Sequence, residues 1–114
     1  MFIEPSIYSS FRGTAIGNYL YNYILRMKPK LILELGVLNG YSTSCFLQAI
    51  RDMPHTTRII SVDLFDLYEF KCCPIDTYVS NVSKYYSPSS RHSILQADVF
   101  SINYPYLNNM YGTI

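Results

Sequence analysis

This chain of 114 residues lacks long apolar runs, an excess of charge and a cysteine pattern. No apolar run approaches the length needed to span a bilayer, so we expect no membrane segment. Lys and Arg number 9 against 8 Asp and Glu, and this near balance gives no support for a nucleic-acid partner. The three cysteines form neither a disulfide framework nor a zinc pattern, so we predict no metal site and expect a reducing, cytoplasmic location.

The residues that are present favour a small α/β domain. Hydrophobic residues make up 49% of the chain, which argues against disorder and allows one domain with a real core. Strands that alternate with helices predict right-handed βαβ units and a parallel sheet. The predicted segments are helices over residues 14–28, 42–52, 76–86 and 102–110, and strands over residues 31–35, 58–62 and 93–96.

Candidate ligand groups follow each of the three predicted strands. The first strand leads into Gly36-x-x-x-Gly40, the second ends at Asp63 and the third at Asp98. Glycines let a ligand come close to the backbone, and a helix that starts after them offers unpaired N–H groups to an anion. Because ligands of open parallel sheets bind beyond the carboxyl ends of the strands, these residues predict a cofactor site.

The spacing of the glycines distinguishes between cofactors. The Gly36-x-x-x-Gly40 spacing lacks the tight pyrophosphate turn of Gly-x-Gly-x-x-Gly, which argues against NAD or FAD. No lysine follows the glycines, so the loop is not a phosphate-binding P-loop either. A carboxylate such as Asp63, at the tip of the second strand, can accept both hydroxyls of a ribose. Asp98, or the backbone around it, is expected beside an adenine ring.

The first of these loops carries a family resemblance. The segment Glu34-Leu-Gly-Val-Leu-Asn-Gly-Tyr-Ser42 resembles the first motif of class I S-adenosylmethionine-dependent methyltransferases. It looks closest to the small-molecule O-methyltransferases of the catechol and caffeoyl-CoA type. The resemblance covers roughly residues 30–99. It implies S-adenosylmethionine as the cofactor and a small-molecule methyl acceptor as the other ligand.

The resemblance also implies roles for individual residues. By it, Gly36 and Gly40 line the methionine part of the cofactor, and Ser42 binds the methionine carboxylate with Tyr41 beside it. Asp63 matches the acidic ribose ligand, and the segment around Asp98 matches the loop that meets adenine. The full set of expected cofactor-binding residues is Glu34, Gly36, Gly40, Tyr41, Ser42, Asp63 and Asp98.

The sequence departs from the family after the third strand. The family continues through a fourth strand with acidic and catalytic residues, whereas this sequence stops at Ile114, where that strand is expected to begin. We therefore expect a Rossmann-like parallel sheet with flanking helices, truncated after its third strand, and we assign no catalytic residue. The expected organisation is a single partial methyltransferase-like domain over residues 1–114, with an N-terminal helical segment at 1–29 and a cofactor-binding half at 30–114.

Truncation has a physical consequence for the sheet. In the family's strand order the strand at residues 31–35 would become an apolar edge, which is a template for pairing with another chain. We therefore expect a homodimer, or a companion chain, to cover that edge.

Simpler roles stay open for several residues. Glu34 either orients the loop or caps backbone amides. Ser42 is at least as well explained as a helix N-cap. For Gly36 and Gly40 the alternative is a plain turn, and for Asp63 it is a solvated carboxylate at a strand end.

Two functions from different classes fit the sequence. The first is an S-adenosylmethionine-dependent methyltransferase, or its cofactor-binding fragment, that transfers a methyl group to an O or N acceptor. The second is a non-catalytic truncated paralogue that acts as a binding or interaction module. A nucleotide- or NAD-binding oxidoreductase half is disfavoured by the glycine spacing.

Overall fold

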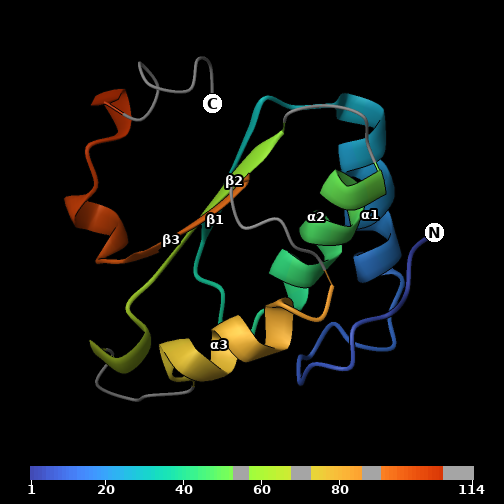
Figure 1. Cartoon of the computed structure of the whole chain (residues 1–114), viewed down its shortest axis with the longest axis horizontal. Helices are drawn as coiled ribbons and strands as arrows, with labels where there is room; N and C mark the ends of the chain where they lie inside the picture. The colour runs from blue at the N-terminus through green and yellow to red at the C-terminus, as the bar shows by residue number, and fades with distance from the viewer. Residues whose placement is uncertain (53–56, 68–72, 86–90, 107–114) are drawn as a thin grey trace.

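The fold is a three-stranded parallel sheet with helices packed on it. The computed structural model describes residues 1–52, 57–67, 73–85 and 91–106. Across the sheet the strands are ordered β1 (Leu31–Leu35), β2 (Arg58–Asp63) and β3 (His92–Gln96), so β2 is central (Figure 1). This confirms the expected α/β class.

In chain order, the elements are α1 (Ile16–Met27), β1 (Leu31–Leu35), α2 (Tyr41–Asp52), β2 (Arg58–Asp63), the short 3₁₀ helix η1 (Phe65–Leu67), α3 (Ile75–Val82), β3 (His92–Gln96) and the 3₁₀ helix η3 (Val99–Ser101).

The strand register brings the three carboxyl ends to one edge. Leu35 of β1 lies opposite Val62, and Asp63 of β2 lies opposite Gln96. The ladder continues one residue further on both sides, because Gly36 N–H donates to the Val62 carbonyl at 2.8 Å and Ala97 N–H donates to the Asp63 carbonyl at 3.0 Å. The loops that follow the three strands therefore begin next to one another at the carboxyl edge of the sheet.

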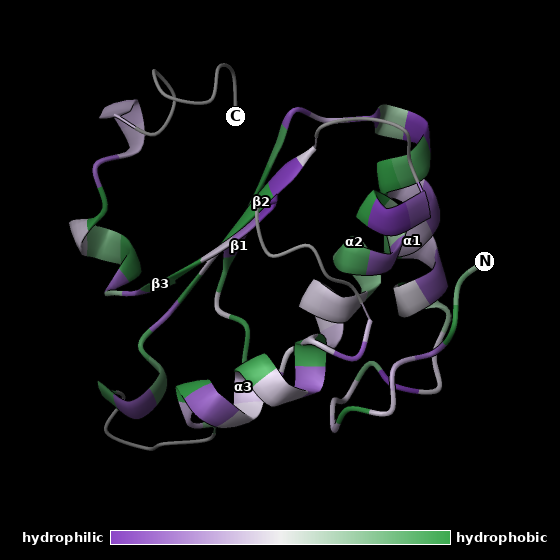
Figure 2. Cartoon of the chain, in the orientation of Figure 1, coloured by the Kyte–Doolittle hydropathy of each residue, from purple (hydrophilic) through white to green (hydrophobic). Residues whose placement is uncertain are grey.

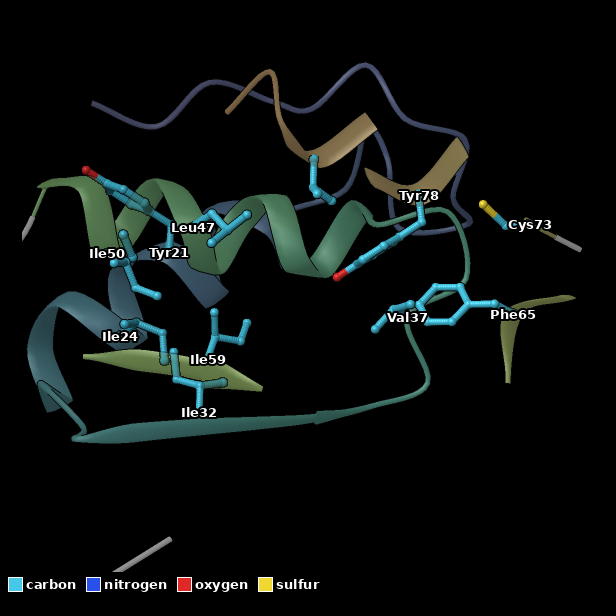
Figure 3. Packing of buried hydrophobic residues seen from close by; sticks show 12 residues of the cluster. Tyr21, Ile24, Ile32, Val37, Leu47, Ile50, Ile59, Phe65, Cys73 and Tyr78 are labelled. Atoms are coloured by element: carbon cyan, nitrogen blue, oxygen red, sulfur yellow. The ribbon is translucent and has the colours of Figure 1, made fainter. Parts of the chain in front are cut away.

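The main hydrophobic core lies between one face of the sheet and the three α-helices. Ile32 of β1 and Ile59 of β2 point toward Ile24 of α1 and toward Leu47 and Ile50 of α2 (Figure 3). Alternate strand residues share a face, so this side of β1 and β2 carries the core. Hydrophilic and hydrophobic stretches alternate along each helix (Figure 2), as expected for helices with one side on a core.

Helix α2 is buried on more than one side. The sequence predicts Cys45, Phe46, Ala49 and Ile50 as its inner face; three of these are fully buried, whereas Phe46 is partly buried. The buried amide of Gln48 pairs with the backbone of Ile3, donating to its carbonyl and accepting from its N–H at 2.7 Å each. The first thirteen residues, which contain no helix or strand, are thereby held against α2.

The opposite face of the sheet is covered by much less. Its cluster consists of Leu31, Ile60 and Val62, and the partly buried residues around it include Leu33 and Val99. Helices α1, α2 and α3 all lie on the other side, while η3 lies on this one (Figure 1). Leu35, at the end of β1, is 49% exposed.

Helix α1 buries a different stripe from the one that the apolar spacing indicates, which is Ile16, Leu20, Tyr23, Ile24 and Met27. Its buried residues are Gly17, Tyr21 and Ile24, whereas Tyr23 and Met27 are exposed. A Cβ at Gly17 would lie 2.3 Å from the Tyr41 hydroxyl oxygen. The backbone of α1 approaches α2 closely at the glycine, so the stripe that contains the glycine turns inward.

Two other segments differ from expectation or lie outside the described residues. Helix α3 ends at Val82, earlier than predicted, and residues 83–85 form a turn. Helical spacing predicts Val79 and Val82 on its inner side; Val82 is buried together with Tyr78, whereas Val79 is 42% exposed. The helix predicted over 102–110 lies partly, and the expected fourth strand from residue 112 wholly, outside the described residues.

Candidate functional site

A cavity of about 490 Å³ lies beyond the carboxyl ends of the strands. It brings together three of the residues that the sequence singled out at strand ends, namely Gly36, Asp63 and Asp98. The remaining wall is mainly apolar and comes from the loop after β1, from η1 and η3 with the residues next to them, and from the segment before α3. The other lining residues are Leu38, Leu64, Phe65, Cys73, Ala97, Val99 and Phe100.

A second cavity of about 330 Å³ adjoins the same loop. It shares Gly36 and Leu38 with the first cavity, so the 36–40 loop lies between the two. Tyr41 and Ser42 at the start of α2 contribute to its wall, and so do Tyr8, Ser9, Ser10 and Phe11 of the N-terminal segment, together with Val37 and Asn39.

The two glycines of the loop have different surroundings. Both have a positive φ, +80° at Gly36 and +99° at Gly40, which glycine adopts without strain. A Cβ at Gly36 would meet nothing within 4 Å, so this backbone is open to a ligand. A Cβ at Gly40 would lie 2.6 Å from Val82 Cγ1 and 3.1 Å from a ring carbon of Tyr78. Gly40 therefore lines neither cavity and instead lets α3 pack against the loop.

Asp63 holds the loop through its carboxylate. One oxygen accepts from Val37 N–H at 2.8 Å, and the other accepts from Phe65 N–H at 2.8 Å. Leu38 N–H makes a longer bond to the first oxygen at 3.4 Å, and since a carboxylate offers about four lone-pair positions, some acceptor capacity remains. Asp63 is thus more than a solvated strand-end charge, because it joins the loop after β1 to the turn after β2.

Asp98 begins η3 on the far side of the same cavity. Its carboxylate accepts from Phe100 N–H at 2.9 Å and caps the short helix. The ring of Phe100 is 94% exposed, although it lines the cavity. The ring of Phe65, which lines the same cavity, is buried. The cavity therefore has an aromatic side chain from each of the loops that follow β2 and β3.

Glu34 is a buried carboxylate at the end of β1, 7% exposed. It accepts hydrogen bonds from three hydroxyls: Ser42, Thr43 at 2.5 Å and Ser61 at 2.9 Å. Burial raises the pKa of Glu34, and these three hydroxyl donors act in the opposite direction. None of the hydrogen bonds in the described parts of the chain joins this carboxylate to a backbone amide, so Glu34 ties α2 and β2 to β1 rather than capping a turn.

Ser42 is not the N-cap of α2. The helix begins at Tyr41, so Ser42 lies in the first turn, and its hydroxyl donates to Glu34. The neighbouring hydroxyl of Tyr41 donates to Glu4 of the N-terminal segment, and burial and this bond raise the pKa of Tyr41. Both residues line the second cavity, yet both hydroxyls already have partners within the chain.

Sequence reasoning missed part of the site. The wall residues Tyr8 to Phe11 carry no motif, and they reach the loop because Asn39 Nδ2 donates to the Tyr8 carbonyl at 3.1 Å. Phe65 and Phe100 lie two residues after Asp63 and Asp98, respectively. An aromatic residue at the same offset from two strand-end carboxylates was a signal that the sequence offered.

The cavities contain few groups that could transfer a proton. No histidine or lysine lines either cavity, within the described ranges of the chain. The same ranges contain no cluster of His, Cys, Asp or Glu that could hold a metal ion. Nor does any helix there have the length and apolar character needed to cross a membrane.

Comparison with known proteins identifies the fold. No protein-family model matches the chain, and no curated protein is significantly similar to it in sequence. Among solved structures, the chain is similar to the apo structure of CalS11, a TDP-rhamnose 3'-O-methyltransferase of calicheamicin biosynthesis, with a TM-score of 0.55 and 21% sequence identity. The match covers 87% of this chain and 45% of CalS11. The chain thus has a Rossmann-like fold and spans less than half the length of this neighbour.

Proposed function

We propose that the chain binds S-adenosylmethionine at the carboxyl edge of its sheet and is the cofactor-binding part of a methyltransferase. The observation that carries the proposal is the convergence of Gly36, Asp63 and Asp98 on one cavity. These residues follow three different strands. The fold shared with an O-methyltransferase and the motif at Glu34–Ser42 support the same assignment.

The two cavities suit the two halves of this cofactor. In the proposed arrangement, adenosine occupies the first cavity, where Asp63 accepts the ribose hydroxyls and Phe100 covers the adenine ring. The methionine part crosses the open backbone of Gly36 into the second cavity, toward Tyr41 and Ser42. The open space next to Gly36, which a Cβ would enter, fits such a close approach.

The bound cofactor would supply a methyl group on a positively charged sulfur. The contribution of this chain is to bind and orient that group. The acceptor in the proposal is a small molecule with an O or N nucleophile, and the rhamnose hydroxyl named for CalS11 supports an oxygen acceptor. The closer subtype suggested by the sequence, that of catechol and caffeoyl-CoA enzymes, remains a prediction.

A non-catalytic binding module is the second candidate. It is favoured by the absence of histidine and lysine from the cavity walls in the described ranges, since Asp63 and Asp98 are the carboxylates left there to accept a proton. Both of these already accept backbone hydrogen bonds. A chain that binds the cofactor but methylates no acceptor in a panel of phenols, sugars and amines would support this candidate.

Calorimetric titration with S-adenosylhomocysteine tests the cofactor site. We expect micromolar binding by the wild-type chain, and a decrease of at least about tenfold in Asp63→Ala, because a charged hydrogen-bond acceptor is lost. Asp66→Ala is the matched control: it removes a carboxylate from η1 that lines neither cavity. Absence of binding by a wild-type chain that circular dichroism shows to be folded would refute the proposal.

A further inference from the structure

A buried chain of polar side chains runs behind the candidate site and joins all three strands to α2 and α3. It starts at His92 in β3, passes Ser61 in β2 and Tyr78 in α3, and reaches Glu34 through Thr43. Glu34, Thr43, Ser61 and Tyr78 are buried, and His92 is partly buried. Burying so many polar groups costs free energy unless each is hydrogen-bonded, so the connections decide what the cluster does.

The hydrogen bonds have a single consistent direction. The Tyr78 hydroxyl donates to Thr43 Oγ1 at 3.0 Å, and Thr43 in turn donates to Glu34 at 2.5 Å. The Ser61 hydroxyl also donates to Glu34, at 2.9 Å. Each hydroxyl has one proton, so the oxygens of Ser61 and Tyr78 are left as acceptors.

His92 completes this arrangement. Its Nε2 lies 3.1 Å from Ser61 Oγ and 3.2 Å from the Tyr78 hydroxyl oxygen. Because these two hydroxyls donate to Glu34 and Thr43, we assign the hydrogen of the neutral ring to Nε2, where Ser61 and Tyr78 can accept it. Burial lowers the pKa of His92 to about 4, which agrees with a neutral imidazole at pH 7. In this assignment, the hydrogen bonds from His92 and Tyr78 lead through Ser61 and Thr43 to Glu34.

The same tyrosine packs directly against the loop between the cavities. Figure 3 shows Tyr78 with its hydroxyl directed toward the start of α2 and its ring near Val37 and Phe65. The rings of Tyr78 and Phe65 are 5.1 Å apart between centroids. A ring carbon of Tyr78 also lies 3.1 Å from where a Cβ of Gly40 would be. One residue thus contacts the cavity wall, the loop and the first turn of α2.

A second side chain of α3 holds the same loop. Asn81 Nδ2 donates to the Asn39 carbonyl at 3.0 Å. The loop is therefore held from α3 at two positions, while Asp63 holds it from β2. Leu38, at its centre, has a φ of +48°, a left-handed conformation that a residue other than glycine adopts at some cost. Contacts on both sides are needed to keep such a conformation.

We propose that Tyr78 and His92 are positioning residues for the 36–40 loop. They act through the hydroxyl groups that converge on Glu34, and neither residue lines a cavity. The proposal rests on the proposed function in one respect, which is that the loop carries the cofactor. Its structural content is that the loop loses its fixed shape when the hydroxyl of Tyr78 is removed.

Two phenylalanine variants with the same chemical change test the proposal. Tyr78→Phe keeps the ring and removes its hydroxyl. Tyr21→Phe is the matched control, because the Tyr21 hydroxyl donates to Asp52 at the opposite end of α2, also from a buried ring. Both variants lose one side-chain hydrogen bond to α2, and Tyr78→Phe also removes one of the two oxygens beside His92 Nε2. The variants therefore differ in their distance from the loop and in their link to His92.

Amide hydrogen exchange at the loop is the first measurement. The amides of Val37 and Gly40 are both hydrogen-bonded, to Asp63 and to the Val37 carbonyl. In Tyr78→Phe we expect them to exchange about tenfold faster relative to the amides of α1, and in Tyr21→Phe we expect no such relative change. Equal loop exchange in the two variants, or in Tyr78→Phe and wild type, would overturn the proposal.

Affinity for S-adenosylhomocysteine is the second measurement. We expect Tyr78→Phe to bind about fivefold more weakly than wild type, and Tyr21→Phe to bind as wild type does. An unchanged affinity in Tyr78→Phe would contradict the proposal. If wild type itself does not bind, the proposed function fails, while loop exchange still decides whether Tyr78 positions the loop.

A double variant tests whether His92 belongs to the same chain. His92→Leu removes the donor at its start. If both residues act through one chain, combining His92→Leu with Tyr78→Phe speeds loop exchange little beyond the larger single effect. If the increases in the loop exchange rate from the two substitutions multiply in the double variant, the two residues act independently, and His92 is removed from the proposal.

Discussion

The two faces of the sheet are covered very differently. On the helix side, Ile59 of the central strand is fully buried under α1 and α2. On the other side, Leu33 is only partly buried, and η3 is the element that reaches over the cluster (Figure 1). Parallel sheets are normally covered on both faces. The comparison teaches that this chain stabilises itself mainly from one side. The candidate site lies beyond the ends of the strands, and η3 of the thinly covered side forms part of its wall.

Truncating one core residue on each face of the sheet should give the largest difference in the free energy of unfolding. We expect Ile59→Ala to lower the free energy of unfolding by about 3 kcal/mol, because it leaves a cavity in the main core. Leu33→Ala, on the thinly covered face, should cost about 1 kcal/mol, since part of its side chain is already exposed. Urea denaturation of both variants measures this. Equal losses would mean that the second face is as well packed as the first.

Acid should weaken the helix-side face through His92. Its pKa in the folded chain, about 4, lies below the usual 6.5, so the unfolded chain binds a proton more readily between these values. The associated stability is present above pH 6.5 and is lost as the pH falls to 4, by about 2 kcal/mol after allowance for partial exposure.

The pH effect is best measured as a difference. Wild type and His92→Gln are unfolded with urea across pH 4 to 7, because glutamine does not titrate and other acid effects are common to both chains. The gap between the two unfolding free energies should narrow as the pH falls. A gap that stays constant with pH would contradict the effect of burial on His92.

The free edge of the sheet should cause association. Strand β1 pairs with β2 alone among the described strands, and Leu35 at its end is 49% exposed. We expect purified chain to self-associate as its concentration rises, since an unpaired apolar edge pairs readily with another strand. Leu35→Lys should weaken association several-fold and change the stability of the monomer by less than about 0.5 kcal/mol.

Sedimentation velocity at several concentrations measures this association. Tyr19→Lys is the control for added charge, because Tyr19 is 61% exposed and its helix α1 packs on the other face of the sheet from η3. Association that is unaffected by Leu35→Lys would place the contact elsewhere. A monomer at every concentration would remove the expectation of a homodimer.

Phe100 should give the smallest change in stability. Its ring is 94% exposed, so Phe100→Ala should leave the free energy of unfolding within about 0.5 kcal/mol of wild type. If the ring stacks on adenine, affinity for S-adenosylhomocysteine should still fall about fivefold or more. Calorimetry and urea denaturation of the same preparation separate the two effects. An unchanged affinity would exclude Phe100 from the adenine contact.

Much of the framework could be predicted from local sequence. The strand over residues 31–35 has the predicted bounds because an apolar run that meets glycine has few alternatives. The N-cap role left open for Ser42 was wrong, because the helix already begins at Tyr41 and the Ser42 hydroxyl donates to Glu34, eight residues earlier. The inward position of Tyr78 was also missed, since helical spacing favoured Val79 and gave no information about a partner on α2.

By itself, the sequence determined the order of strands and helices along the chain and which residues stand at the strand ends. Both follow from short-range physics: hydrophobic runs, glycine, and the directions in which strand residues point. Only the tertiary structure decided which of those residues share a cavity and that Gly40 faces α3 while Gly36 stays open. The buried chain from His92 to Glu34 was likewise decided there, because its hydrogen bonds join elements far apart in sequence, whose pairing depends on how the whole core packs.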